Sequence, residues 1–261
     1  MTTTIRIERR SDGVALLILA RAQVHNAFNE VMIAEMTEAL GALAADASVR
    51  AVVLKAEGKS FSAGADLDWM KRMAGYGEAE NLADAQALAG LMRTLATLPK
   101  PTIAQVQGAA FGGGVGLVAC CDIAVAAEGA LFCLSEVRLG LIPAVIAPYV
   151  IDAIGARAAR RWFLTAERFD AAEALRLGLL HQVVPADGLE SAVEALLDRL
   201  HEGAPGAQAA AKALIFAVSH RPVDDALVED SARRIARLRA GPEGREGIAA
   251  FLEKRAPAWG A

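Results

Sequence analysis

The sequence predicts an α/β core followed by a helical region, and three observations lead to this fold class. Short apolar runs alternate with segments of helical periodicity over the first half of the chain. Strand signals nearly vanish beyond about residue 145, while helical composition continues. Alanine supplies much of the 54% hydrophobic content and aromatic residues only 5%, which favours helices and close backbone packing. We therefore expect parallel strands with helices outside them.

The N-terminal part predicts a hairpin, a helix and a third strand. Residues 3–9 alternate polar side chains with Ile5 and Ile7, as an edge strand does. Asp12-Gly13 then indicates a turn into an apolar strand at residues 14–19. A helix with Asn29 as its N-cap comes next, before a strand at residues 51–54. The apolar positions of this helix are Met32, Ile33, Met36, Leu40 and Leu43.

A similar order recurs after residue 100 and then gives way to helices. Residues 102–106 and 122–126 are typical of strands, and residues 112–121 of a helix built from small side chains. Helical segments follow at 156–164, 171–177, 189–200, 207–218 and 223–238, with Gly and Pro between them. We expect a core over residues 1–190 and a helical region over residues 191–261. Helices without a sheet must bury their apolar faces, so a partner subunit is expected.

Composition argues against several classes of protein. The 261 residues carry a net charge of −4, basic residues cluster only locally, and the pI is near 5.7, so we expect no nucleic-acid partner. Residues 101–121 carry no charge and are long enough to span a bilayer. They contain five glycines and two glutamines, however, and no second such segment exists, so we expect no membrane insertion.

The cysteines and histidines indicate neither a disulfide framework nor a metal site. Cys120, Cys121 and Cys133 lie in apolar surroundings without a CxxC pair, which favours a reducing compartment. The four histidines are far apart, so no metal is expected. The first residues lack the basic and apolar blocks of a secretory signal, and a cytoplasmic location is the expectation.

Two glycine-bearing turns are the first candidates for chemistry. Residues 60–67 and 108–116 each follow a predicted strand and lead into a helix through small side chains. Such a turn leaves backbone N–H groups unpaired at the positive end of a helix dipole. Two of them side by side could aim two donors at one developing oxyanion. The alternative is that these glycines only permit close helix packing.

Glu136 is the third candidate. It is the lone acid among Phe132, Leu134, Val137 and Leu139. Apolar surroundings disfavour the charged form, so we expect a raised pKa that suits a proton donor or base. The alternative is a structural ion pair with Arg138 or another cation.

Taken together, these stretches resemble the crotonase superfamily, also called the enoyl-CoA hydratase/isomerase family, from about Ile5 to the C-terminus. The resemblance implies a spiral of ββα repeats with a C-terminal helical oligomerisation region, and an acyl-coenzyme A substrate whose thioester becomes an enolate. Coenzyme A is then part of the substrate, and no separate cofactor is implied. The matching motifs are Asn26-Ala-Phe28, Phe61-Ser-Ala-Gly-Ala-Asp66, Gln107 through Gly114, Cys121-Asp-Ile123, Ser135-Glu136 and Phe251-Leu-Glu-Lys-Arg255.

The resemblance implies roles for individual residues. By position, Ala65 and Gly113 would supply the two N–H groups that hold the thioester oxygen. Ala63, Asp66 and Leu67 would hold the adenine end of coenzyme A by backbone contacts.

The C-terminal motif implies a role between subunits. Phe251 and Lys254 would reach the coenzyme A of a neighbouring subunit in a trimer or a dimer of trimers. For Lys254 the alternative is a solvated helix charge.

One position departs from the family pattern. Many family hydratases carry a first glutamate where this chain has Gly116 and a second at the place of Glu136. Isomerases of the family keep only the second acid, which by itself favours isomerase. Residues 112–122, 133–148 and 163–169 nevertheless resemble the bacterial methylglutaconyl-CoA hydratase branch and its neighbour acting on isohexenylglutaconyl-CoA, which carry the same glycine. Trp69, Met73 and Gly116 would line the substrate pocket; the alternative for Trp69 and Met73 is a core pair at i,i+4 spacing.

The expected function is therefore hydration of an α,β-unsaturated acyl-CoA, 3-methylglutaconyl-CoA or a related branched glutaconyl-CoA, as in leucine degradation. Two alternatives stay open. One is an enoyl-CoA isomerase that uses the single acid Glu136. The other is a non-catalytic relative that binds acyl-CoA or RNA. Salt-sensitive affinity for RNA would identify an RNA-binding protein.

Overall fold

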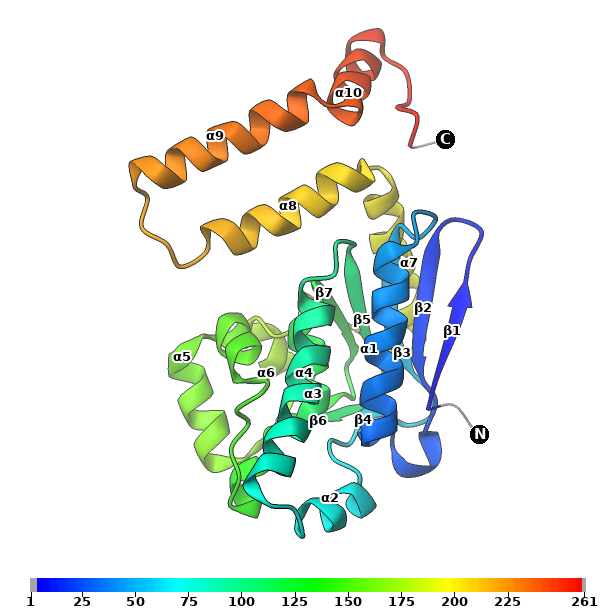
Figure 1. Cartoon of the computed structure of the whole chain (residues 1–261). Coiled ribbons are helices and arrows are strands. Elements are labelled where there is room, and N and C mark those ends of the chain that lie inside the picture. The colour runs from blue at the N-terminus through cyan, green and yellow to red at the C-terminus, as the bar shows by residue number, and fades with distance from the viewer. Residues whose placement is uncertain (1–3, 260–261) are drawn as a thin grey trace.

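The centre of the protein is a six-stranded sheet, seen in a computed structural model that describes residues 4–259 (Figure 1). Its order is β1-β2-β3-β5-β7-β10, with β1 antiparallel to β2 and the other neighbours parallel. The expected N-terminal hairpin is confirmed. The strands are β1 (Ile5–Arg9), β2 (Val14–Leu19), β3 (Ala51–Ala56), β5 (Thr102–Val106), β7 (Ile123–Ala127) and β10 (Gln182–Val184).

A second, smaller sheet lies beside the first. Its order is β4-β6-β8-β9; β4, β6 and β8 are mutually parallel, and β9 is antiparallel to β8. Each strand has three residues, too few for an alternating pattern to be recognised in the sequence. The strands are β4 (Ser60–Ser62), β6 (Ala109–Phe111), β8 (Leu131–Cys133) and β9 (Arg168–Asp170).

The chain alternates between the two sheets and then forms a helix, three times in succession. β3 and β4 lead to α2 (Leu67–Met73) and α3 (Glu78–Ala96), and β5 and β6 lead to α4 (Gly113–Cys120). β7 and β8 lead to the 3₁₀ turn η2 (Glu136–Leu139) and to α5 (Ala147–Thr165). This is the spiral of ββα repeats that the resemblance implied.

Both faces of the large sheet are covered. On one face, α1 (Glu30–Ala45), α3 and α4 pack over alternate strand residues such as Leu54 and Val106. Asn29 caps α1 by accepting a hydrogen bond from the N–H of Met32, and all five predicted apolar positions of α1 are buried. The other face packs against α7 (Leu189–His201). α7 thus crosses the division expected at residue 190 while remaining attached to the sheet.

The helices that stand apart from the sheets begin at Pro205. α8 (Pro205–Val218), α9 (Asp225–Ala240) and α10 (Pro242–Glu253) lie together beyond one end of the large sheet, opposite α2 (Figure 1). α6 (Ala171–Leu177) agrees with its predicted bounds. In the part of the chain that the structure describes, no helix is both long and apolar enough to cross a membrane.

Two helices were not expected, and one is longer than predicted. In α3 only the last two turns are buried, so most of the helix has no apolar face to signal it. α10 lies within the helical region expected over residues 191–261 but was not predicted as a separate helix, and it buries only Ala250. α5 begins nine residues before the expected start. Gly155, with φ of 75°, interrupts its helical geometry, and the predicted segment covered only the part after this glycine.

Candidate active site

Three segments that carried the sequence motifs meet at one edge of the smaller sheet. β4 runs into the turn at residues 63–66, β6 into Gly112-Gly113, and β8 into residues 134–136. Because these strands are parallel neighbours, their carboxyl ends lie at the same edge. Segments about 25 to 50 residues apart in the sequence are thereby brought together, and ligand sites in α/β proteins commonly form at such ends.

The first turn is held against residues 25–28. The N–H of Phe28 donates to the carbonyl of Gly64 at 2.7 Å, and the N–H of Asp66 donates to the carbonyl of Phe28 at 2.8 Å. The N–H of Ala63 donates to the carbonyl of His25 at 2.9 Å. Ala65 lies between these bonds, and its own N–H has no acceptor within residues 4–259. A backbone donor is therefore left free at an exposed alanine.

The second turn depends on a glycine conformation. Gly112 has φ of 49° and ψ of −118°, a combination that residues with a side chain rarely adopt. Its N–H donates to the carbonyl of Cys133 at 2.9 Å, which fixes the turn to the end of β8. Gly113 then opens α4, and no described residue accepts its N–H. This second free donor lies at the positive end of α4.

The two turns are in direct contact. A methyl group placed on Gly64 would lie 3.2 Å from the carbonyl oxygen of Phe111, and one placed on Gly112 would lie 3.9 Å from the Cα of Gly64. The ring of Phe28 would lie 3.2 Å from a methyl group on Gly113. The free N–H groups therefore belong to abutting segments, an arrangement that suits two donors to one oxygen.

Glu136 carries its carboxyl to the same place. A methyl group on Gly112 would lie 3.1 Å from its Oε1, while its Oε2 is buried and has no hydrogen-bond partner among the described residues. Removal of the carboxyl from water raises the pKa of Glu136, as the sequence predicted. Arg138 points elsewhere and donates to the carbonyl of Ala166 at 2.7 Å, so the alternative of an ion pair between these two neighbours is wrong.

Gly116 packs against side chains that are distant from it in the sequence. A methyl group at this position would lie 2.2 Å from the Cγ2 of Ile146 and 3.3 Å from the Cε of Met92. The place where many family hydratases carry a first acid is thus filled by an isoleucine 30 positions further along the chain. Nothing local in the sequence indicates a contact of this range.

The residues expected to contact coenzyme A or to line the pocket differ in how far they are buried. Ala63 and Leu67 are exposed on the turn, whereas the carboxylate of Asp66 is turned inward. Trp69 is only 4% exposed, belongs to the main hydrophobic core, and donates from Nε1 to Asp84 at 3.2 Å. Met73 packs against this core, half-buried, as the core-pair alternative expects.

Phe251 and Lys254 do not join the site of their own chain. Both lie at the end of α10, at the opposite end of the molecule from α2 (Figure 1). Phe251 is 83% exposed.

The comparisons agree on one family. The family model described as enoyl-CoA hydratase/isomerase matches residues 9–261. The enoyl-CoA hydratase AKT6-1 of Alternaria alternata is 35% identical over 250 residues, which are 93% of this chain and 80% of that protein.

Solved structures agree over the whole fold. An enoyl-CoA hydratase from Shewanella pealeana is 49% identical with a TM-score of 0.95, over 98% of this chain and 96% of that one. AtuE of Pseudomonas aeruginosa is 42% identical with a TM-score of 0.94, over 99% of this chain and 100% of that one. The chain therefore belongs to the enoyl-CoA hydratase/isomerase family, the crotonase superfamily.

Proposed function

We propose that this protein is an enoyl-CoA hydratase in which Glu136 is the only side chain that carries protons. The observation that supports this most is the convergence of two free N–H groups, from Ala65 and Gly113, with one buried carboxyl at the ends of three parallel strands. In this proposal the thioester oxygen accepts from both N–H groups, so that negative charge gathering there is stabilised.

Each proton has a defined route in the reaction. The ionised carboxylate of Glu136 takes a proton from water as the water oxygen bonds to the β-carbon. The double-bond electrons move onto the thioester oxygen and form the enolate. Glu136 then returns its proton to the α-carbon, and the enolate collapses to the thioester. The net result is one water added across the double bond, and the raised pKa of Glu136 suits both transfers.

We propose a branched glutaconyl-CoA, such as 3-methylglutaconyl-CoA, as the substrate. This choice is supported by the resemblance of residues 112–122, 133–148 and 163–169 to that bacterial branch, including the glycine at position 116. With this substrate the protein would act in the breakdown of branched acyl groups, as in leucine degradation, and we propose a cytoplasmic location.

The rest of the coenzyme A binding would involve two subunits. Ala63, Asp66 and Leu67 offer the backbone of the first turn to the adenine end. Phe251 and Lys254 would come from a neighbouring chain, in a trimer or a dimer of trimers joined through residues 191–261. The position of α10 far from the site of its own chain supports such an exchange.

One observation favours a second candidate, an enoyl-CoA isomerase. Ile146 fills the place next to Gly116, so a second acid has no room there. A single carboxyl can take a proton from one carbon of the acyl chain and return it to another without water. Glu136 would serve this reaction with the same two N–H donors.

One assay distinguishes these functions. The protein is incubated with crotonyl-CoA, 3-methylglutaconyl-CoA and a 3-enoyl-CoA, and the absorbance of the conjugated thioester is followed. A hydratase removes the absorbance of the first two substrates, whereas an isomerase creates absorbance from the third. In parallel, Glu136→Gln should lower turnover by about 10²- to 10⁴-fold while acyl-CoA still binds.

The outcomes separate the alternatives. Full activity of Glu136→Gln would remove Glu136 from the reaction. Coenzyme A binding without turnover of any of the three substrates would favour a non-catalytic relative. Absorbance gained from the 3-enoyl-CoA alone would favour the isomerase.

A further inference from the structure

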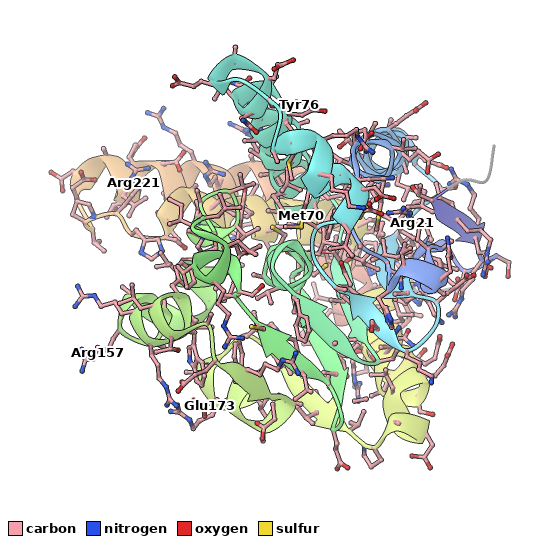
Figure 2. All side chains as sticks on the ribbon, turned by 90° about the horizontal axis from the view of Figure 1, so that it is seen from below. Arg21, Met70, Tyr76, Arg157, Glu173 and Arg221 are labelled. Atoms are coloured by element: carbon pink, nitrogen blue, oxygen red, sulfur yellow. The ribbon has the colours of Figure 1, made fainter. Side chains whose placement is uncertain are left out.

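Arg21 lies behind the first turn, in a segment to which the proposed reaction assigns no role. It follows β2, and its side chain is only 15% exposed. Figure 2 shows Arg21 beside the turn that leads into α2, the helix that carries Met70. Its backbone is fixed by Asn26, which is fully buried: the N–H of Arg21 donates to Asn26 Oδ1 at 2.8 Å, and the N–H of Asn26 donates to the carbonyl of Arg21 at 2.9 Å.

The guanidinium joins two segments that flank Ala65. One nitrogen donates to Asp66 Oδ2 at 2.8 Å, and another donates to the carbonyl of Ala27. Asp66 is the residue after Ala65, and its carboxylate is 11% exposed. The Arg21–Asp66 pair is shielded from water and its hydrogen bond is charge-assisted. We therefore expect it to hold the two segments together more strongly than a surface ion pair would.

Asp66 passes this constraint to the start of α2. Its Oδ1 accepts from the N–H groups of Asp68 at 2.9 Å and Trp69 at 3.2 Å, which caps the helix. Its own N–H is bonded to Phe28. One carboxylate therefore accepts from Arg21 on one oxygen and from the start of the helix on the other, and the residue before it, Ala65, carries the free N–H.

Phe28 links the same assembly to the second turn. Its backbone pairs with residues 64–66, and its buried ring packs against Gly113. Residues 21–28 therefore contact both turns: Phe28 holds the main chain on both sides of Ala65, and Arg21 holds the side chain of Asp66.

We propose that Arg21 is a positioning residue for the Ala65 N–H, acting through Asp66. This inference rests on the proposed function, in which that N–H holds the thioester oxygen. Arg21 touches no reacting atom. It holds the turn so that the donor stays aimed while charge develops on the oxygen, and small losses of aim are costly at such sites.

The test uses Arg21→Met, which is similar in length and removes both donors. The matched control is Arg10→Met: Arg10 also joins two elements through a partly buried pair, with Glu194 on α7, but it contacts neither turn. The readout is the carbonyl stretching frequency of a ¹³C-labelled saturated acyl-CoA bound to each variant, together with kcat, KM and thermal unfolding.

In the wild-type protein we expect the bound carbonyl to vibrate at a lower frequency than in the free thioester. Arg21→Met should return it most of the way towards the free value and lower kcat by about 10- to 100-fold, with KM changing less than about threefold. Arg21→Lys keeps the charge beside Asp66 but loses the two-pronged geometry of the guanidinium. Its carbonyl frequency and kcat should therefore lie between those of the wild-type protein and those of Arg21→Met. Arg10→Met should leave the carbonyl frequency and kcat unchanged.

The failures of the two proposals look different. A wild-type carbonyl that does not shift on binding would contradict the role of the two N–H groups itself. A shifted wild-type carbonyl that stays equally shifted in Arg21→Met would overturn the role of Arg21 alone. If Arg21→Met does not fold, an Arg21→Lys protein with wild-type frequency and kcat would overturn it as well.

Discussion

At the scale of single residues, Glu136 is unfavourable for stability but suited to the proposed reaction. Its Oε2 is buried without a partner in the described part of the chain, and a buried polar atom left unpaired is unfavourable for folding. The same loss of water raises the pKa of the carboxyl. We therefore expect Glu136, which the proposed reaction requires, to lower the stability of the folded protein at neutral pH.

Glu136→Gln should accordingly stabilise the protein in a pH-dependent way. A carboxyl whose pKa is raised by folding binds protons more readily in the folded state, so the free energy of unfolding falls as pH rises from the ordinary glutamate value through the raised one. The neutral amide lacks this dependence. Thermal unfolding should show a higher Tm for Glu136→Gln at pH 7, and a difference that shrinks as the pH falls and is smallest below about pH 4, where the carboxyl is protonated in both states. A constant difference across this range would contradict a shift caused by burial.

Gly116 and Ile146 should be coupled. Since a methyl group at Gly116 would lie 2.2 Å from Ile146, Gly116→Ala should lower the free energy of unfolding by about 1–3 kcal/mol. In an Ile146→Ala background the added methyl group has room, so the same change should cost much less. Denaturant unfolding of both single variants and the double variant measures this coupling. Equal costs in both backgrounds would mean that Ile146 does not limit the space at Gly116.

At the scale of elements, the sequence predicted five of the six strands of the large sheet, because β2, β3, β5 and β7 are largely apolar runs of five or six residues and β1 alternates polar with apolar side chains. It did not predict β10, which has only three residues. It could not predict the small sheet, whose three-residue strands carry no period. The motif resemblance nevertheless named Ala65, Gly113 and Glu136, and the structure shows why they meet: each follows one of three parallel neighbours. The contacts of Arg21 with Asp66 and of Gly116 with Ile146 span 45 and 30 positions, and no local pattern signals them.

One lysine of α8 is bonded to the core of the protein. Lys212 is 11% exposed and donates to Asp122 Oδ2 at 2.8 Å, the same oxygen that accepts from the N–H and hydroxyl of Thr102. Lys212→Met should lower the free energy of unfolding by about 1–3 kcal/mol, because a shielded carboxylate loses its cation. The control is Lys71→Met, which breaks an exposed pair with Asp68 and should change stability by less than about 0.5 kcal/mol. Equal effects on thermal unfolding would contradict this attachment.

At the scale of the whole molecule, the C-terminal helices leave a large apolar surface open. α8 to α10 bury few of their own side chains, and their separation from the sheets is plain in Figure 1. Exposed apolar surface of this extent is typical of an interface. The large apolar side chains exposed there are Ile215, Phe216, Val228, Ile235, Leu238, Ile248, Phe251 and Leu252.

We therefore expect the protein to self-associate through these helices. Light scattering coupled to size-exclusion chromatography should give three or six times the 27.3 kDa of the chain. Leu252→Asp places a charge in this surface and should reduce the mass, whereas Leu164→Asp, at an exposed position on α5, serves as the control. A wild-type mass of one chain would contradict the oligomer and the proposed contribution of Phe251 and Lys254 to a neighbouring site.

The most direct test is a crystal structure of the protein with a saturated acyl-CoA bound. The thioester oxygen should lie about 2.7–3.1 Å from the nitrogens of both Ala65 and Gly113, with the Glu136 carboxyl beside the α- and β-carbons. A thioester oxygen bound away from either nitrogen, or a Glu136 side chain turned from the acyl group, would contradict the account.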